Sequence, residues 1–281
     1  MNIWMQIFVI SYSNIKRWSK NPRILFVFVL SGLLTISISD EVLRFSYDIK
    51  QPLGLLEPYI MMFSGMHNFM LLIGGIILLF CDAPFFDNAT VFFLIRVGRT
   101  QWILGQILYI CLTMLIYLTW LFVISALWCM DNAFIANIWS DIAMLLSRTD
   151  ASNHVGIFFS VNVFTNLSPI LAFFHTAAFI YLYGIFIGLV MLILNMKFGS
   201  VEGVCAAMLI HLSGWALSFT MQPNLYIFSP MLNAVLRLHS FDYGMEPTII
   251  QSYIILFTII LVTAAALRFV LKEYNFTTSY I

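Results

Sequence analysis

The chain has 281 residues, of which 62% are hydrophobic and only 9% are charged, and its formal net charge at pH 7 is zero. A soluble globular domain carries roughly 25% charged residues, so a water-soluble fold of this size could not bury so much apolar surface. The composition therefore predicts a polytopic membrane protein. The sequence contains no basic tail or stripe, and this argues against a nucleic-acid partner.

Residues 1–23 have the pattern of an amphipathic helix. One helical face collects Trp4, Ile7, Phe8, Ser11, Ile15 and Trp18, whereas Gln6, Ser13, Lys16 and Lys20 fall largely elsewhere. Apolar residues at this spacing, together with tryptophans and basic residues, suit a helix that lies in the membrane interface. The segment is expected to anchor the chain at the membrane surface, and an additional contact with a cytoplasmic partner is the alternative.

Residues 24–281 are predicted to form one transmembrane domain of six helices, so the fold class expected is all-α. A helix needs about 20 mostly apolar residues to cross a bilayer. The stretches that meet or approach this length lie at about 24–39, 58–81, 102–129, 169–194, 201–221 and 249–267.

The basic residues predict the orientation of these spans. If both termini lie on one side, that side holds nine of them: Lys16, Arg17, Lys20, Arg23, Arg96, Arg99, Lys197, Arg268 and Lys272. The other side holds four: Arg44, Lys50, Arg148 and Arg237. Basic residues concentrate on the cytoplasmic side of membrane proteins, so both termini are expected to be cytoplasmic.

The loop between the second and third spans is unusually apolar for a cytoplasmic segment. It reads "CDAPFFDNATVFFLIRVGRT". Pro84 stops or opens a helix, Asp87 or Asn88 can cap the next one, and Gly98 suits its left-handed end. The pattern predicts a short helix that lies crosswise at the cytoplasmic surface. Its apolar side either docks into a groove of a partner protein or rests on lipid headgroups.

The segment before the last span, on the external side, is apolar but interrupted by Pro223, Pro230 and Pro247. A short re-entrant or surface helix is expected from about residue 230 to 239. Irregular backbone at membrane depth persists only where protein or water satisfies its polar groups.

Six spans, cytoplasmic termini, an amphipathic N-terminal helix and this inner loop resemble the permease subunits of ABC-2 type transporters. Asp87 followed by "LIRVGRTQW" looks like the coupling loop of that family, and "NLYIFSPMLNAV" looks like its external re-entrant region. The resemblance implies that the loop is a coupling helix that docks on an ATPase. The residues expected at that interface are Phe85, Phe86, Asp87, Phe92, Phe93, Arg96, Gly98 and Arg99.

The sequence has no G-x-x-x-x-G-K-[ST] motif and no soluble domain large enough to bind a nucleotide. The chain is therefore expected to be neither an enzyme nor a cofactor-binding protein. The resemblance implies that ATP and Mg²⁺ bind a separate ATPase subunit, present in two copies, and that a second permease, identical or homologous, completes an exporter in the bacterial plasma membrane. Its cargo would leave between the paired permeases, near the first, second and fifth spans. The aromatic-rich spans suit an amphipathic or antimicrobial-type peptide, or a lipid-like molecule, carried for export or self-immunity.

Polar side chains inside the predicted spans are candidates for the translocation path. They are His67 and Asn68 in the second span, His175 in the fourth and His211 in the fifth. The structural interpretation of each histidine is a hydrogen bond between helices. A proton relay through the three histidines is the alternative, and it would indicate a proton-coupled secondary transporter. An intramembrane enzyme is the third hypothesis, but the spans lack G-x-S-x-G, H-E-x-x-H and paired-aspartate motifs. The cysteines and histidines have no metal-binding spacing.

Overall fold

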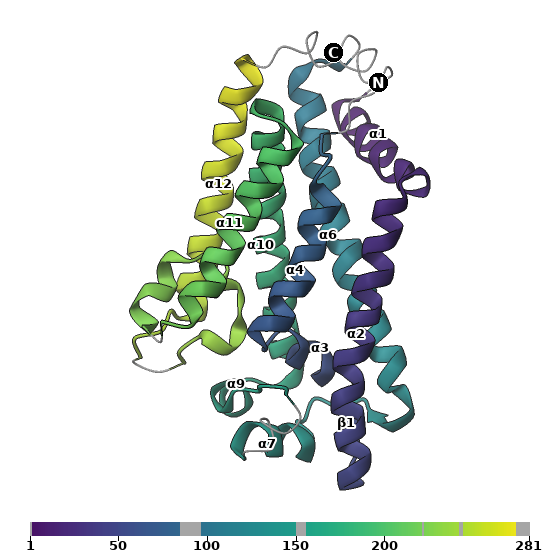
Figure 1. Cartoon of the computed structure of the whole chain (residues 1–281), viewed down its shortest axis with the longest axis vertical. Helices are drawn as coiled ribbons and strands as arrows, with labels where there is room; N and C mark the ends of the chain where they lie inside the picture. The colour runs from purple at the N-terminus through teal and green to yellow at the C-terminus, as the bar shows by residue number, and fades with distance from the viewer. Residues whose placement is uncertain (1, 85–96, 150–155, 221, 242–243, 274–281) are drawn as a thin grey trace.

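Long apolar helices dominate the fold (Figure 1). The computed structural model describes residues 2–84, 97–149, 156–220, 222–241 and 244–273, and the structural statements below concern these residues. Five of their helices are long and apolar enough to cross a membrane. These are α2 (Pro22–Ile49), α6 (Arg99–Cys129), α10 (Pro169–Lys197), α11 (Ser200–Ser218) and α12 (Ile249–Glu273). The described chain thus has the helices of a multi-pass membrane protein, as the composition predicts.

The prediction of six uninterrupted spans is wrong for the second one. Where one helix was expected over 58–81, the structure has α3 (Glu57–Met62) and α4 (Met66–Phe80), and α4 has only 15 residues. The extended backbone of Gly65 begins α4, and the Ser64 hydroxyl donates to the Ile60 carbonyl at 3.0 Å. The small residues at this point end one helix and start another, although the hydropathy is continuous.

Helix α2 is longer than the predicted span over 24–39, with 28 residues. It continues into a polar stretch that hydropathy excludes. Asp40 and Arg44 lie one helical turn apart there and form an ion pair at 2.6 Å, a spacing that supports helix formation. The helix ends at Lys50, which has a positive φ of 59°. The other long helices lie where the sequence predicts them, although α12 continues past residue 267.

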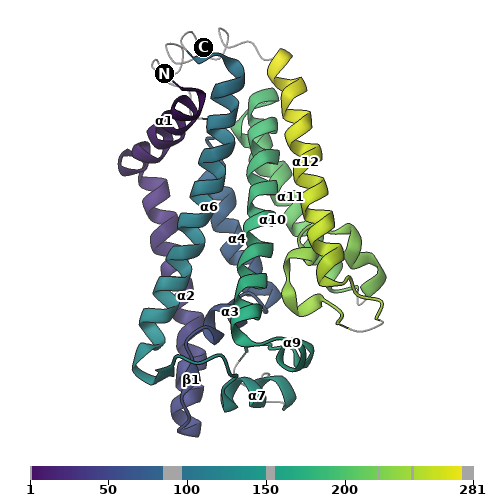
Figure 2. The same cartoon turned by 180° about the vertical axis from the view of Figure 1, so that it is seen from behind.

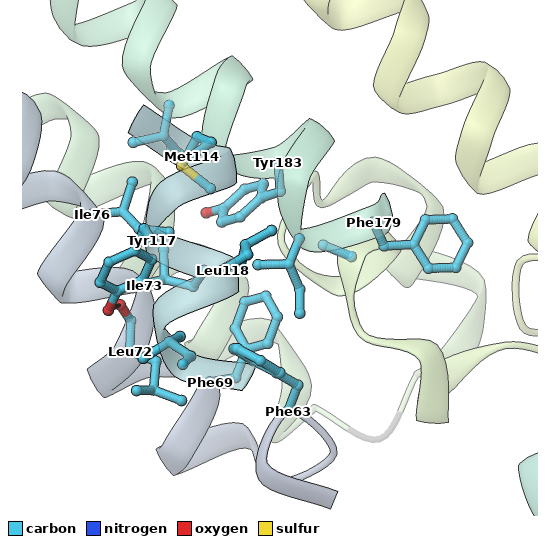
Figure 3. Close-up of a cluster of buried hydrophobic side chains, with 14 of the residues drawn as sticks. Phe63, Phe69, Leu72, Ile73, Ile76, Met114, Tyr117, Leu118, Phe179 and Tyr183 are labelled. Carbon is cyan, nitrogen blue, oxygen red and sulfur yellow. Dashed lines mark hydrogen bonds between the residues drawn. The ribbon is translucent and has the colours of Figure 1, made fainter. Parts of the chain in front are cut away.

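Helix α10 is the central and most buried of the long helices. It contacts α4, α6, α11 and α12, and the two opposite views show it among them (Figures 1 and 2). Its glycines allow the closest approach to α6. Met114 packs directly against Gly184, and a Cβ on Gly188 would lie 2.7 Å from Ile110 Cγ2. Figure 3 shows the buried side chains around this contact, including Met114 and Tyr183.

The N-terminal segment forms the predicted helix, α1 (Ile3–Lys16), followed by the turn η1 (Arg17–Lys20). Figure 1 shows α1 inclined to α2, at the end of the bundle where both termini lie. Its buried face packs on α6 and consists of Ile7, Ile10, Ser11 and Asn14. Ile7 and Ser11 of the predicted apolar face lie on this buried side, whereas Trp4 of the same predicted face is 77% exposed. Gly105 of α6 leaves room for Ile10, and this allows the buried side of α1 to pack closely on α6.

The opposite end of the bundle is covered by short elements. They are β1 (Leu53–Gly54), η2 (Met130–Asn132), β2 (Ala133–Phe134), α7 (Asp141–Arg148) and α9 (Val161–Asn166), and β1 pairs in parallel with β2. The fully buried carboxyl group of Glu57 connects α3 to Ser140, the residue that precedes α7. It accepts hydrogen bonds from the Ser140 backbone N–H at 2.7 Å and the Ser140 hydroxyl at 2.5 Å. Burial raises the pKa of Glu57, against the opposing effect of these bonds.

The segment before α12 folds as 3₁₀ turns rather than as one helix over 230–239. The turns are η3 (Pro223–Phe228), η4 (Leu232–Ala234) and η5 (Leu236–Leu238). The buried Asn233 side chain donates to the carbonyls of Tyr226, Ile227 and Ser229 and accepts from the Ser252 hydroxyl of α12 at 2.7 Å. Because this amide satisfies backbone groups that a helix would use, the irregular backbone can pack against α10 and α12.

The glycine contact between α6 and α10 gives the first prediction. Gly188→Ala should lower the free energy of unfolding by about 1–3 kcal/mol, since the added methyl group must displace a branched isoleucine. Thermal unfolding of the purified protein in detergent measures the effect. Gly74→Ala is the matched control, because a Cβ there meets no atom within 4 Å. Equal thermal midpoints for the two variants would contradict the importance of this contact.

Candidate functional site

The apolar loop between α4 and α6 is the strongest functional candidate in the sequence. Its predicted contact residues Phe85, Phe86, Asp87, Phe92, Phe93 and Arg96 lie outside the described residues. Gly98 and Arg99 are described. Gly98 has a positive φ of 85°, a conformation that favours glycine, and it lies directly before α6, which begins at Arg99. The described residues on either side of the loop are held by contacts with other helices.

The end of the loop that leaves α4 is bound from two other helices. Asp82 forms an ion pair with Arg23 of α2 at 2.6 Å. Arg23 holds the pKa of the Asp82 carboxyl below its usual value, mainly through this hydrogen bond. On the other side, the Asn195 side chain of α10 donates to the carbonyls of Cys81 at 3.0 Å and Ala83 at 2.6 Å. Residues 81–83 are thus attached to the beginning of α2 and to the end of α10.

A glycine allows the Asn195 side chain to reach these carbonyls. Gly203 of α11 lies against it so closely that any Cβ at this position would collide with the amide oxygen. The packing of α11 on α10 therefore fixes the side chain that holds the loop. Arg23, Asp82 and Asn195 were not singled out by the sequence analysis, because their pairing depends on contacts between distant helices.

The end of the loop that enters α6 is held by the N-terminal segment. The Asn14 side chain donates to Gln106 Oε1 at 2.9 Å, and both residues are buried. One turn further along α6, the Trp18 indole N–H donates to the Tyr109 hydroxyl at 3.1 Å. Buried polar pairs of this kind fix the register of two helices, since an unmade hydrogen bond would cost about 1–3 kcal/mol. The first turns of α6 are consequently attached to α1 and η1.

A lateral groove in the bundle forms a second candidate site. It has a volume of about 290 Å³ and lies between α2, α4 and α11. Gly74 and Gly75 of α4 contribute to its lining. A Cβ on Gly75 would lie 2.8 Å from the Tyr117 hydroxyl, which donates to the Leu72 carbonyl at 2.8 Å. The remaining lining is apolar apart from Ser31: Val27, Leu30, Leu34, Met70, Leu71, Ile77, Leu78, Val204 and Met208.

Two of the three predicted histidines, His175 and His211, bridge helices by hydrogen bonds, and none of the three lines this groove. His211 is buried, and its Nε2 lies 3.2 Å from the Met70 carbonyl of α4, so this nitrogen donates. Its Nδ1 then accepts from the Tyr183 hydroxyl of α10 at 3.0 Å. His175 of α10 is hydrogen-bonded through Nδ1 to the Tyr253 hydroxyl of α12 at 2.9 Å. The interhelical hydrogen bonds predicted as the structural interpretation are thus present at both residues.

The four predicted path residues do not form one polar chain in the described structure. His67 is exposed, with its ring 5.9 Å from that of Trp215, and Asn68 beside it is half-buried. Along α10, Phe179 stands between His175 and Tyr183, and its ring has no group that can pass a proton. No cluster of three or more His, Cys, Asp or Glu side chains suited to a metal ion occurs among the described residues.

Comparisons with protein-family models, with curated proteins and with solved structures give no match to this chain. The site is therefore interpreted from its own geometry.

The histidine geometry gives a second prediction. His211→Ala should destabilise the protein by about 1–3 kcal/mol, since it leaves the buried Tyr183 hydroxyl and the Met70 carbonyl without their partner. His67→Ala is the control, because that ring is exposed and should be replaceable at little cost. Thermal midpoints in detergent compare the two variants. If His211→Ala is as stable as the wild type and instead abolishes proton flux in vesicles, the structural role is wrong.

Proposed function

We propose that the chain is the transmembrane permease subunit of an ABC exporter, driven by a separate ATPase subunit. The observation that supports the proposal most is the attachment of both ends of the loop at 85–96. At one end, residues 81–83 are bound by Arg23 of α2 and Asn195 of α10. Beyond the other end, the first turns of α6 are bound by Asn14 of α1 and Trp18 of η1. A partner that pushes or turns the loop would move four helices at once, which is what coupling to an ATPase requires.

The residues of the loop indicate what kind of surface the partner would offer. The loop carries four phenylalanines in two pairs, with Asp87 between the pairs and Arg96 and Arg99 after the second pair. An apolar helix with charged flanks fits a groove on another protein. In this proposal the loop and both termini face the cytoplasm, where ATP is available, and α1 rests in the inner membrane interface. ATP and Mg²⁺ would bind two ATPase subunits.

The groove between α2, α4 and α11 is the proposed cargo path. Its lining is almost entirely apolar, which suits a lipid-like molecule or an amphipathic peptide. Leu33 of α2 and Leu209 of α11, each next in sequence to a lining residue, are exposed. A second permease, identical or homologous, would cover this face, so that the path lies between two subunits. The buried turns around Asn233, at the end opposite the termini, are the proposed external re-entrant segment.

The alternative function, a proton-coupled secondary transporter, receives less support. It needs the histidines to exchange protons, whereas His175 and His211 are each engaged with a separate tyrosine. On α10, Phe179 lies between His175 and Tyr183, the hydrogen-bond partner of His211.

The proposal predicts that the loop binds the ATPase. Phe92→Asp combined with Phe93→Asp should abolish retention of the ATPase subunit, because charged side chains cannot enter an apolar groove. The measurement is affinity purification of tagged variants from native membranes, with quantification of the ATPase for each permease chain. Phe228→Asp is the matched control, since Phe228 is 79% exposed and lies in η3, far from the loop in sequence. Unchanged retention by the loop variant would contradict the coupling role.

A further inference from the structure

Helices α6 and α10 pack through glycines at one half of their length. At the other half a cleft lies between them, where the rings of Phe122 of α6 and Phe173 of α10 meet with their centroids 5.0 Å apart. At the half near the termini, Gly184 and Gly188 bring α10 against Met114 and Ile110 of α6. Because the helices run antiparallel, the residues beyond this contact are 115–122 on α6 and 173–181 on α10. A cleft of about 410 Å³ opens between these two segments.

This cleft is bounded at both ends. The Met114–Gly184 contact closes its inner end. Near the other end, the buried Tyr59 packs its ring 5.9 Å from that of Phe122 and 5.0 Å from that of Phe173. Ala177 and Ala178 are small and leave space beside Leu118. The result is a defined apolar cavity in the side of the bundle.

A second cavity of about 320 Å³ lies at the outer end of α10, between this helix, the segment 54–57 and the segment 134–137, and Glu57 and Asn137 are its polar lining residues. Pro169 and Ile170 line it, one turn before Phe173 and Phe174 of the first cavity. The loop after β2 covers it and leaves Ile135 88% exposed. Both cavities are thus lined by residues of α10, and the exposed Ile135 lines the outer one.

The hydrocarbon region of the membrane would lie beside the cleft, and this indicates which molecule occupies it. Both of its long walls are helices that are long and apolar enough to span a membrane, so acyl chains are the molecules that adjoin it. Phe174 is 63% exposed at its side, which leaves the cleft open laterally. The lining is apolar apart from the hydroxyls of Tyr59, Tyr181 and Thr119. A helix about 10–12 Å across cannot enter between α6 and α10 while their glycine contact holds.

We propose that this cleft binds one acyl chain of a bilayer phospholipid, in the leaflet at the end opposite the termini, as a lipid that stays with the protein. Because lipid tails are as apolar as the site, retention depends on fit rather than on a hydrophobic driving force. Neither set of described lining residues contains Lys or Arg, and the one acidic side chain, Glu57, is fully buried and hydrogen-bonded to Ser140, so headgroup charge should not select the lipid. The inference requires only that the chain spans a membrane, and it is independent of the transport proposal.

The first test counts retained lipids by native mass spectrometry. The full-length protein is reconstituted in vesicles of equal parts phosphatidylcholine and phosphatidylglycerol and then extracted in mild detergent. The wild type should retain one phospholipid per chain, of either headgroup, and Ala177→Phe should lose it by filling the cleft. Ala265→Phe, at an exposed position on α12, is the matched control and should retain it. A wild type without lipid, selective retention of phosphatidylglycerol, or an Ala177→Phe variant that keeps the lipid would overturn the proposal.

A second measurement needs no substitution and decides the matter even if Ala177→Phe fails to fold. The wild type is labelled in vesicles that contain a photoactivatable phosphatidylcholine with the reactive group in its acyl chain. Peptides that cover 115–122 and 170–181 should carry more label than the exposed face of α12 around Phe257 and Leu261. An equal distribution of label between the cleft and α12 would show that no acyl chain is held there.

Discussion

The close contact between α6 and α10 is the constraint on which the rest of the structure depends. Gly184 and Gly188 allow α6 to approach the central helix, and this contact fixes what lies on either side of it. Toward the termini, Asn195 of α10 reaches the chain that leaves α4. Toward the opposite end, the aromatic-lined cleft lies between the two helices. Because interhelical hydrogen bonds in membranes are worth only about 1–2 kcal/mol or less, such packing has to supply much of the specificity.

The proposed function follows from how the same packing holds a loop. Asp82 pairs with Arg23 of α2, and Gln106 near the start of α6 pairs with Asn14 of α1. The two chain segments that lead into the loop are thus attached to different helices. A force applied to it is distributed over the bundle, and the groove between α2, α4 and α11 lies next to two of the helices that would receive it.

Much of the helix arrangement could be predicted from the sequence, because apolar length is a strong local signal. The division at Phe63–Gly65 could not, since hydropathy is continuous there and only backbone conformation separates α3 from α4. The extension of α2 past residue 39 was missed because charged residues in a helix do not read as a span. The pairing of His175 with Tyr253 followed the structural interpretation, but Asn195 carried no signal, since its role depends on Gly203 and on residues 81–83 being brought to it by folding.

The central claim is that another protein supplies the energy, and one measurement addresses it most directly. The wild-type chain is tagged, purified gently from its native membranes, and assayed for ATP hydrolysis while each stoichiometric partner is identified. The account predicts a co-purifying nucleotide-binding subunit with ATPase activity. A chain that purifies alone, without ATP hydrolysis, and that moves protons in reconstituted vesicles would contradict it.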